Sequence, residues 1–305
     1  MIKPPSLHKG DTIGIVAPAR KINFEELEFA IKSIESWGLK VKLGKNIFGS
    51  DYQFSGTDEE RTADLQRMLD DTSVKAILCA RGGYGTLRII DFLDFISFKK
   101  TPKWIIGYSD ITVLHSHIHT NFEIETLHAT MPINFSKDAE SVETLRKCLF
   151  GEKLSYIFET HPLNKKGNAE GIIIGGNLSL IYALTGSCSD INTDNKILFI
   201  EDLDEYLYHI DRMMLNLKRS GKLKNLAALI VGGMSDMKDN TVPFGKTAEE
   251  IILDSVKEYN YPVCFNFPSG HLTKNFALPL GSKVKLQIQE SVKIIFLFRK
   301  NFNFV

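Results

Sequence analysis

Two serines occur in the same short pattern, G-x-S-D, each after an apolar run. Ser109 follows the run Trp104–Ile106 and precedes a further apolar segment, whereas Ser235 follows Ala228–Val231 and precedes a polar one. A serine on a sharp turn between a strand and a helix is exposed at the carboxyl edge of a sheet, where the next N–H can bind an oxyanion. Because Ser and Asp before a helix also act as N-caps, the pattern alone does not establish a nucleophile. The apolar helix expected after Ser109 favours it over Ser235.

A glycine-rich segment, Arg81–Gly85, lies between the apolar run Val74–Cys79 and an expected helix. Backbone N–H groups at such a helix start favour an anion. A dinucleotide site would require G-x-G-x-x-G and an acidic residue about 20 positions further on, and this segment has neither. We therefore interpret the segment either as a tight turn that needs glycine or as part of an oxyanion hole.

An acidic run, Glu201–Glu205, and a loop histidine, His271, could form an acid–base pair. Glu201 directly follows the apolar run Ile197–Ile200, and flanking Pro and Gly residues place His271 on an accessible loop. A carboxylate at the end of a strand can orient a histidine. Alternatively, the acidic run complements the dipole of a following helix and the histidine is solvated. Neither feature decides the function by itself.

Neither the histidines nor the cysteines are spaced as metal ligands. His115 and His119 could share a helix face, with His117 between them, but no H-E-x-x-H acid or third ligand accompanies them. The cysteines contain no C-x-x-C pair and stand at Cys79, Cys148, Cys188 and Cys264. We expect no metal and no cofactor, and we interpret Cys79 and Cys264 as core thiols.

Short apolar runs alternate with amphipathic segments over the first 135 residues. Strands are expected at Thr12–Val16, Lys40–Leu43, Val74–Cys79, Trp104–Ile106 and Ile124–Leu127, and helices at Phe24–Trp37, Asp58–Leu69, Thr86–Phe95 and Ile111–His119. This alternation is typical of a parallel sheet covered by helices on both faces. Residues 1–135 are therefore predicted to form a Rossmann-like (flavodoxin-like) α/β domain.

The rest of the chain changes character twice. Residues 136–168 are polar and carry both signs of charge, so they are predicted to cross between domains, with one helix at Ala139–Phe150. In residues 169–305, strands are expected at Gly171–Ile174, Ile197–Ile200, Ala228–Val231, Val284–Ile288 and Val292–Phe298, and helices at Leu178–Leu184 and Leu207–Arg219. This pattern predicts a second, smaller domain of mixed α/β structure.

The composition restricts the class of partner. The chain has 305 residues, of which 43% are hydrophobic, and 37 basic residues balance 37 acidic ones. Without a net basic charge, we expect no nucleic-acid partner. No apolar run reaches the roughly 18 residues of a membrane span, and the run before Ala17–Ala19 falls short of the about 7 residues that a signal peptide needs. The expectation is a cytoplasmic protein that does not enter a membrane.

Taken together, these segments resemble the LD-carboxypeptidases, a family of serine peptidases. The resemblance is carried by Arg81–Gly85, Gly107–Asp110, Glu201 after its apolar run, and Gly270-His271. Further matches are Asp11–Ala19, His128–Pro132, Gly175–Leu178, Tyr208 and Asp211-Arg212, so the resemblance runs from about Gly10 to Gly281. The α/β-hydrolases share the order Ser, Glu, His, but their G-x-S-x-G elbow is absent because Ile111 stands at the last position.

The resemblance implies a catalytic triad and an oxyanion hole. Ser109 would be the nucleophile, Glu201 the acid and His271 the base, with the N–H groups of Gly83 and Asp110 binding the oxyanion. Because the nucleophile comes from the first domain and the other two groups from the second, the cleft is expected between the domains.

Three further residues are candidates for substrate binding. Arg81 and Arg212 could bind the substrate's carboxylate on the ground of their charge, and Asn177 opens the second domain's matching segment. The resemblance implies no metal and no cofactor.

The implied activity is that of a cytosolic homodimer that releases terminal D-Ala from murein tetrapeptides in peptidoglycan recycling by cleaving an L,D-amide bond. Two alternatives stay open. A peptidase similar to the microcin self-immunity enzymes would use the same triad to cleave an amide between an amino acid and a nucleotide-like group. A small-molecule binding protein on a Rossmann-like scaffold would carry out no catalysis. The sequence also leaves open whether the peptide's third residue is lysine or diaminopimelate.

Overall fold

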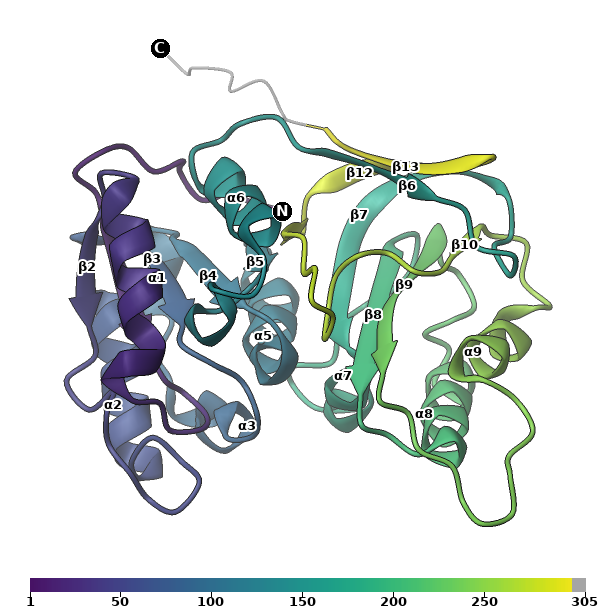
Figure 1. Cartoon of the computed structure of the whole chain (residues 1–305), viewed down its shortest axis with the longest axis horizontal. Coiled ribbons are helices and arrows are strands. Elements are labelled where there is room, and N and C mark those ends of the chain that lie inside the picture. Colours follow the sequence, from purple (N-terminus) through teal and green to yellow (C-terminus); the bar gives the residue numbers. More distant parts are fainter. Residues whose placement is uncertain (298–305) are drawn as a thin grey trace.

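The protein, described by a computed structural model over residues 1–297, has two α/β halves that lie side by side (Figure 1). Each half contains its own sheet, one of six strands and one of seven. The last position of the predicted strand Val292–Phe298 lies outside the described residues. The observed strand there, β13, spans Ser291–Phe296.

The first sheet is parallel over its five N-terminal strands. These are β1 (Thr12–Val16), β2 (Lys40–Leu43), β3 (Val74–Cys79), β4 (Trp104–Gly107) and β5 (Thr126–His128). Their order is β5-β4-β3-β1-β2, and a sixth strand, β11 (Leu278–Leu280), pairs antiparallel with β5. The chain therefore returns from its C-terminal half to complete the first sheet.

Helices cover both faces of this sheet, which explains the continuous apolar strands. On one face, α1 (Phe24–Ser36) and α6 (Ala139–Leu149) share a core with Ile13 and Ile106. On the other, α2 (Asp58–Asp70) and α5 (Thr112–Phe122) pack in the core that contains Ile77 and Ile105. Asn23 and Thr57 start α1 and α2 with capping boxes, in which a side chain accepts a hydrogen bond from the third helical N–H.

The predicted helix Thr86–Phe95 is shorter than expected. It ends as α3 (Thr86–Ile89) with a 3₁₀ turn at Ile90–Phe92, and a separate helix, α4 (Ile96–Lys100), follows. Asp94 Oδ1 accepts a hydrogen bond from the N–H of Ile96 at 2.7 Å, which starts a new helical turn at this point.

The second sheet combines parallel and antiparallel strands. Its parallel part is β7 (Gly167–Asn177), β8 (Ile197–Leu203), β9 (Ala228–Ser235) and β10 (Val263–Cys264). Its antiparallel part is β12 (Lys283–Ile288), β13 and β6 (Ser155–Glu159). Three helices pack in the core of one face: α7 (Leu178–Leu184), α8 (Leu207–Arg219) and α9 (Ala248–Val256). The second half is thus a mixed α/β unit, as predicted.

Residues 136–168 contain more structure than a crossing segment. The predicted helix is present as α6, but β6 forms an edge of the second sheet. Tyr156 explains this strand, because its ring packs against Phe267 and Phe296 while its neighbours face solvent. The one charged residue within this strand, Glu159, is exposed. The domain boundaries at 135 and 169 stay a prediction.

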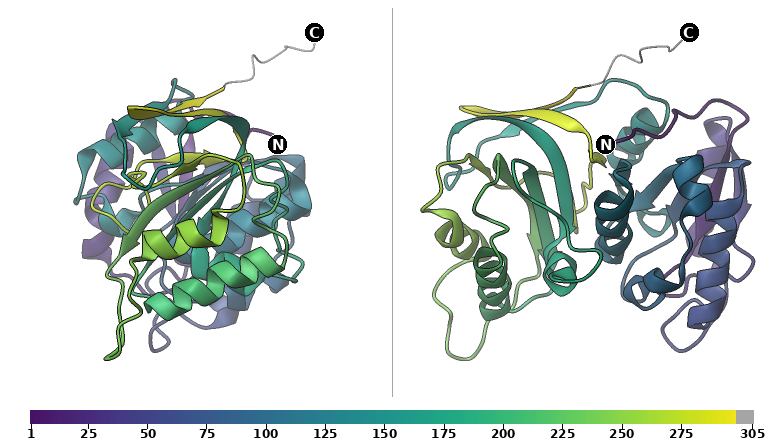
Figure 2. Two further views of the ribbon diagram at one scale, coloured as in Figure 1. Left: turned by 90° about the vertical axis from the view of Figure 1, so that its right-hand side faces the viewer. Right: turned by 180° about the vertical axis from the view of Figure 1, so that it is seen from behind.

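One apolar cluster extends through both halves, so the halves pack directly on each other. It joins Leu127 of β5 and Leu278 of β11 to Phe199 of β8. At the same junction, α5 and α7 lie between the two sheets (Figure 2). Thr112 Oγ1 accepts a hydrogen bond from Asn177 N at 3.0 Å, so the end of β7 contacts the start of α5. Across residues 1–297, no helix is long and apolar enough to cross a bilayer.

Candidate active site

Ser109 lies on the turn between β4 and α5, at the carboxyl edge of the first sheet. Its backbone φ is 64°, a left-handed conformation that is uncommon for a residue with a side chain and costs roughly 1–2 kcal/mol. A 3₁₀ turn, Ser109–Ile111, leads directly into α5. Ser109 is 9% exposed, and its hydroxyl makes no hydrogen bond to another described residue. The fold thus maintains a strained serine with an unpaired hydroxyl at the sheet edge.

The glycine-rich segment packs directly against this serine. A Cβ added to Gly82 would lie 3.0 Å from Ser109 Cβ, 3.1 Å from its Oγ and 3.4 Å from the nitrogen of Asp110. Gly83 has a φ of +111°, which strongly favours glycine. A side chain at Gly82 would fill the space beside the hydroxyl, whereas a Cβ at Gly83 would lie 2.5 Å from Arg20 Cδ, so Gly82 is the residue that permits the close approach to Ser109.

The carboxylate of Asp110 joins the two turns. Asp110 Oδ2 accepts a hydrogen bond from the N–H of Thr86 at 2.8 Å, at the first residue of α3. Burial raises the pKa of Asp110, while the hydrogen bonds from Thr86 and the charge of Arg61 act in the opposite direction. Asp110 therefore fixes the position of the glycine segment relative to Ser109 through its side chain.

Arg61 is a buried residue that the sequence interpretation missed. Its guanidinium donates to the carbonyls of Pro18 and Gly85, at 2.5 and 3.0 Å, and pairs with Asp58. The ring of Phe54 lies 4.8 Å below it. Arg61 ties the loop after β1 to the end of the glycine segment. An arginine within an amphipathic helix gives no sequence signal for such a role.

Glu201 and His271 form a buried pair in the second half. His271 Nδ1 lies 2.6 Å from Glu201 Oε2, and the same oxygen accepts from the His271 backbone N–H at 3.1 Å. Glu201 is fully buried within β8, which extends to Leu203, whereas the sequence interpretation ended this strand at Ile200. A carboxylate in this position fixes which ring nitrogen carries hydrogen, leaving Nε2 to accept a proton.

The carboxylates of Glu201 and Asp202 alter the pKa of the His271 imidazole. Burial acts to lower the pKa of His271, but the charge and hydrogen bond of Glu201, with the charge of Asp202, raise it overall. The pKa of Asp202 itself is raised to about 7 by burial and by the Glu201 charge. Asp202 accepts hydrogen bonds from Asn177 Nδ2 at 2.8 Å and Ser179 N at 2.9 Å.

The loop that carries His271 requires a glycine. Gly270 has a φ of +104°, and a Cβ added there would lie 2.6 Å from Glu201 Oε2. Asn275 stabilises the loop, because its Oδ1 accepts from Gly270 N at 2.9 Å and Ser269 Oγ at 3.0 Å. The sequence interpretation used Gly270 only as a sign of a loop, but the glycine also permits the contact with Glu201.

The serine turn and the histidine loop meet across the junction of the halves. The ring of Tyr108, the residue before Ser109, lies 4.9 Å from the His271 ring. Within residues 1–297, no hydrogen bond joins Ser109 Oγ to the imidazole. Serine–histidine hydrogen bonds in hydrolases are often long before substrate binds. The structure brings the predicted acid and base into contact and places the residue that precedes the predicted serine against the imidazole.

The second G-x-S-D serine occupies a different position. Ser235 lies within β9, not on a turn, and its Oγ donates a hydrogen bond to the His271 carbonyl at 2.5 Å. This hydrogen bond therefore stabilises the loop that carries His271. Of the two serines in this pattern, only Ser109 has a hydroxyl without a partner among residues 1–297.

A cavity of about 280 Å³ adjoins His271. The first half contributes Tyr108, Thr130, Asn134 and Lys137, and the second contributes the loop around His271. The cavity thus lies between the halves. Its volume suits one small amino-acid residue of a substrate, and the remainder of the substrate would lie outside it.

The structure separates the three candidates for substrate binding. Arg81, the first residue of the glycine segment, donates to the carbonyl of Lys21 at 3.1 Å. Asn177 is buried and caps α7, with its amide engaged by Asp202 and Leu180. Arg212 lies on α8, 5.2 Å from the Tyr208 ring. None of the three lines the cavity beside His271, and substrate binding by each stays a prediction.

The histidines of α5 are engaged by protein groups. His115 Nε2 lies 2.9 Å from the Gly107 carbonyl and His119 Nε2 lies 2.9 Å from Thr126 Oγ1. Burial lowers the pKa of His115 to about 4. His117 is half-buried, and its Nδ1 lies 2.9 Å from Oγ of the buried Ser189. Over the part of the chain that the structure describes, no cluster of three His, Cys, Asp or Glu could hold a metal ion.

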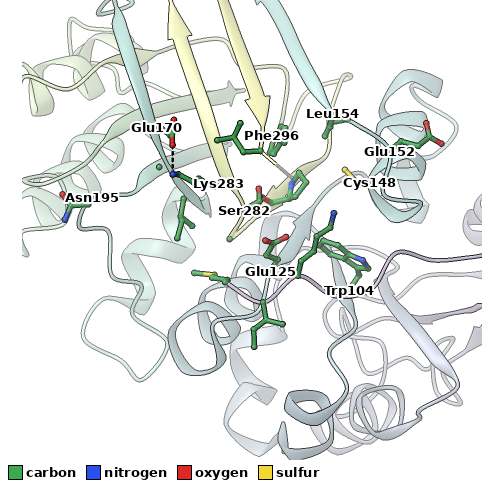
Figure 3. A pocket seen from close by; sticks show the side chains of 18 residues that line it. Trp104, Glu125, Cys148, Glu152, Leu154, Glu170, Asn195, Ser282, Lys283 and Phe296 are labelled. Atoms are coloured by element: carbon green, nitrogen blue, oxygen red, sulfur yellow. Dashed lines mark hydrogen bonds and ion pairs between the residues drawn. The ribbon is translucent and has the colours of Figure 1, made fainter. Parts of the chain in front are cut away.

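A larger cavity, of about 610 Å³, lies away from these groups (Figure 3). Trp104, at the amino end of β4, lines it, whereas Ser109 follows the carboxyl end of the same strand. Glu170 and Lys283 form an ion pair on its wall. None of the predicted catalytic residues contributes to this cavity. Size alone therefore does not identify the reactive site in this fold.

Comparison with known proteins connects this site to a family. A family model described as the LD-carboxypeptidase N-terminal domain matches residues 13–129, and one described as the LD-carboxypeptidase C-terminal domain matches residues 170–286. A probable murein peptide carboxypeptidase of Bacillus subtilis is 39% identical over 304 residues, covering 96% of this chain and 94% of the relative. The two matched regions contain every residue of the predicted triad.

Solved structures with the same fold extend over nearly the whole chain. The muramoyltetrapeptide carboxypeptidase of Oxalobacter formigenes superimposes with a TM-score of 0.85 at 26% identity, covering 95% of this chain and 100% of that one. The microcin C7 self-immunity protein has a TM-score of 0.85 at 23% identity, covering 97% and 98%. The second likeness concerns the fold alone. Both agree with two α/β halves arranged as described above.

Proposed function

The chain belongs to the LD-carboxypeptidase family, and on this premise we propose that it releases terminal D-Ala from murein tetrapeptides. Membership makes it a serine-type carboxypeptidase, which sets aside the non-catalytic alternative. The observation that carries the proposal is the 2.6 Å contact of His271 Nδ1 with Glu201, next to the strained turn of Ser109. These groups have the types and placement that acyl transfer requires.

In the first step, Ser109 Oγ attacks the carbonyl carbon of the scissile amide. A serine hydroxyl is a weak nucleophile, so His271 Nε2 accepts its proton as the new C–O bond forms. Glu201 fixes the tautomer and stabilises the imidazolium that results. Full burial of the carboxylate strengthens this electrostatic effect, because no water screens it.

The developing oxyanion is stabilised by backbone N–H groups of Gly83 and Asp110. Both lie on turns that pack against Ser109, and Asp110 connects those turns through Thr86. The N–H of Gly83 makes no hydrogen bond to another described residue. Two such donors held in place before the reaction stabilise the tetrahedral intermediate without reorganisation.

The intermediate collapses when His271 returns the proton to the departing amine. The C–N bond breaks, the D-Ala amine leaves neutral, and an ester remains on Ser109. Water then attacks this ester with His271 again as base, which releases the shortened peptide and restores the serine hydroxyl. Each proton is returned, so the cycle consumes one water and needs no cofactor.

The substrate class is supported by the relatives. The relative at 39% identity is a probable murein peptide carboxypeptidase, whereas the microcin C7 self-immunity protein is only 23% identical. Cleavage of an aminoacyl-nucleotide amide is the alternative, since the same triad would serve both. A cytoplasmic location and a homodimer remain predictions that accompany this function.

The test is mass spectrometry of a murein tetrapeptide, containing either lysine or diaminopimelate, after incubation with the purified protein. Loss of one D-Ala is expected, and S109A should lower turnover about 10⁴- to 10⁶-fold with an unchanged thermal unfolding midpoint. S235A, in the same sequence pattern, removes only the hydrogen bond to the His271 carbonyl, so its turnover should fall by no more than about tenfold. Near-normal D-Ala release by S109A rejects the proposal.

A competing substrate separates the two peptidase activities. An aspartyl sulfamoyl adenosine analogue with a cleavable amide is incubated in parallel with the tetrapeptide. Faster cleavage of the nucleotide compound, judged by kcat/KM, favours the microcin-type activity. Preference for the peptide supports the proposal.

A further inference from the structure

The cavity beside His271 contains a lysine and no carboxylate. Lys137 lines it from the first half, and no Asp or Glu is among the described residues that line it. Lys137 is exposed, and its ammonium forms no ion pair with any residue in the range 1–297. An ammonium without a carboxylate partner in the lining makes this cavity suited to an anion.

Lys274, which lies nearby in the structure, differs from Lys137 because its charge is paired. Lys274 lies on the loop that follows His271, and its Nζ is 2.7 Å from Glu140 Oε2. Its charge is therefore compensated by a protein carboxylate. Lys137, on the segment before α6, has no such partner among the described residues and remains available to a ligand.

The proposed mechanism determines which part of the substrate reaches this cavity. His271 protonates the leaving amine, so the departing residue must lie on the imidazole side of the scissile bond. In an α-amino acid the carboxylate is attached to the same carbon as the amine. Standard bond lengths keep the two groups within about 4 Å, so the terminal carboxylate enters the space that adjoins His271.

We infer that Lys137 binds the terminal carboxylate of the departing residue, an inference that rests on the proposed function. Tyr108 supports it, because its hydroxyl accepts from Asn134 Nδ2 at 2.6 Å and keeps its own hydrogen for another acceptor. Burial and the Glu201 charge raise the pKa of Tyr108, which maintains the phenol as a donor. An ammonium and a phenol together would bind a carboxylate and exclude an internal peptide bond.

This assignment differs from the arginine candidates. Arg81 begins the glycine segment, and its guanidinium donates to the Lys21 carbonyl and does not line the cavity. Arg212 contacts Tyr208 on α8 and does not line the cavity. Position, not charge alone, distinguishes Lys137, which makes it a specificity-determining residue for removal of a single C-terminal residue.

The test compares a tetrapeptide that ends in D-Ala with the same peptide ending in D-Ala carboxamide. Wild type should prefer the free carboxylate in kcat/KM by about 10- to 100-fold, as expected for a charge-assisted contact. K137M should reduce this preference to about twofold or less, mainly through a raised KM, and K137R should restore most of it. K274M is the matched control and should keep the wild-type preference.

The outcomes separate the inference from the function it rests on. If wild type releases D-Ala but K137M keeps the full preference for the carboxylate, Lys137 does not bind that group. The same conclusion follows if wild type cleaves both peptides equally well. If wild type releases neither residue, the proposed function fails and the inference fails with it. Because Lys137 is exposed, a thermal unfolding midpoint close to wild type should accompany K137M.

Discussion

The carboxylate of Asp110 accepts a hydrogen bond from the N–H of Thr86 over 2.8 Å. The two residues belong to different turns, one after β4 and the other after β3, and both turns flank Ser109. A single buried side chain thus determines the spacing between the two backbone segments proposed to bind the oxyanion. The motif predicts that the backbone N–H of this aspartate binds the oxyanion. Its side chain has a second, structural role, because it connects the two turns.

Removing this side chain should lower turnover more than it lowers substrate binding. We expect D110A to reduce kcat about 10- to 100-fold with little change in KM, because the glycine segment is no longer held in position relative to Ser109. The unpaired N–H of Thr86 should also lower the free energy of unfolding by roughly 1–3 kcal/mol. Steady-state kinetics and urea unfolding measure the two effects.

D110N provides the control for this prediction, since its amide oxygen can still accept from Thr86. It should retain kcat within about fivefold of wild type. Equal damage from D110N and D110A would instead assign the effect to the charge that faces Arg61.

Much of the first half could be predicted because its strands are buried on both faces. Runs such as Ile13–Val16 and Val74–Cys79 have few polar interruptions, and the helices between them carry one apolar face. The family resemblance added the pairing of Glu201 with His271, two residues 70 positions apart. Spacing along the sequence contains no information about that contact.

Other features depend on tertiary contacts that no local pattern records. β11 has three residues with Pro279 in the middle, and its pairing with β5 joins segments about 150 positions apart. Proline within a short apolar stretch argues against a strand, except at a sheet edge, which is where β11 lies. Lys137 likewise stands in a polar segment, where only its place beside the cavity distinguishes it.

Replacing Glu201 should alter the pH dependence as well as the rate. Without its charge and hydrogen bond, burial is offset only by the charge of Asp202 and the pKa of His271 falls. Since the base must be neutral, the acidic limb of the kcat/KM profile of E201Q should move to lower pH, while kcat drops about 10³- to 10⁴-fold from loss of the correct tautomer. Rates measured from pH 5 to 9 test both effects.

The chain contains a second Glu–His pair that serves as control for E201Q. Glu205 Oε2 lies 2.5 Å from His209 Nδ1 at the start of α8, outside the cavity. E205Q should leave the pH profile unchanged. If the acidic limb of the kcat/KM profile lies at the same pH in E201Q as in wild type, the titration of His271 does not determine that limb.

Asp202 should make the protein less stable as the pH rises through the weakly acidic range. Its pKa is raised from 3.8 to about 7, so between these values the folded protein binds a proton that the unfolded chain has released. Stability then decreases with rising pH, by roughly 4 kcal/mol over the window as an upper bound. The difference in unfolding free energy between wild type and D202N should fall by up to this amount from pH 4 to 8.

Asp71 supplies a control of opposite sign for this pH dependence. Hydrogen bonds from Lys42 and Ser73 lower its pKa, so its contribution is present at neutral pH and is lost as the pH falls. For D71N the difference from wild type should therefore grow as the pH rises toward 3.8 and stay nearly constant from pH 4 to 8, where D202N changes. A constant difference between wild type and D202N across the range would contradict the assigned pKa of Asp202.

Gly270 should tolerate alanine poorly because two effects coincide there. The φ of +104° strains any side chain, and the added Cβ would lie 2.6 Å from Glu201 Oε2. Gly245 has a φ of +84° with no atom within 4 Å of its added Cβ, so G245A isolates the backbone effect. We expect G245A to lose about 1 kcal/mol of stability with normal kcat. G270A should lose more stability, and its kcat should fall at least about tenfold because the Glu201–His271 contact must shift. Equal kcat values for the two variants would mean that the loop accommodates the methyl group without moving His271.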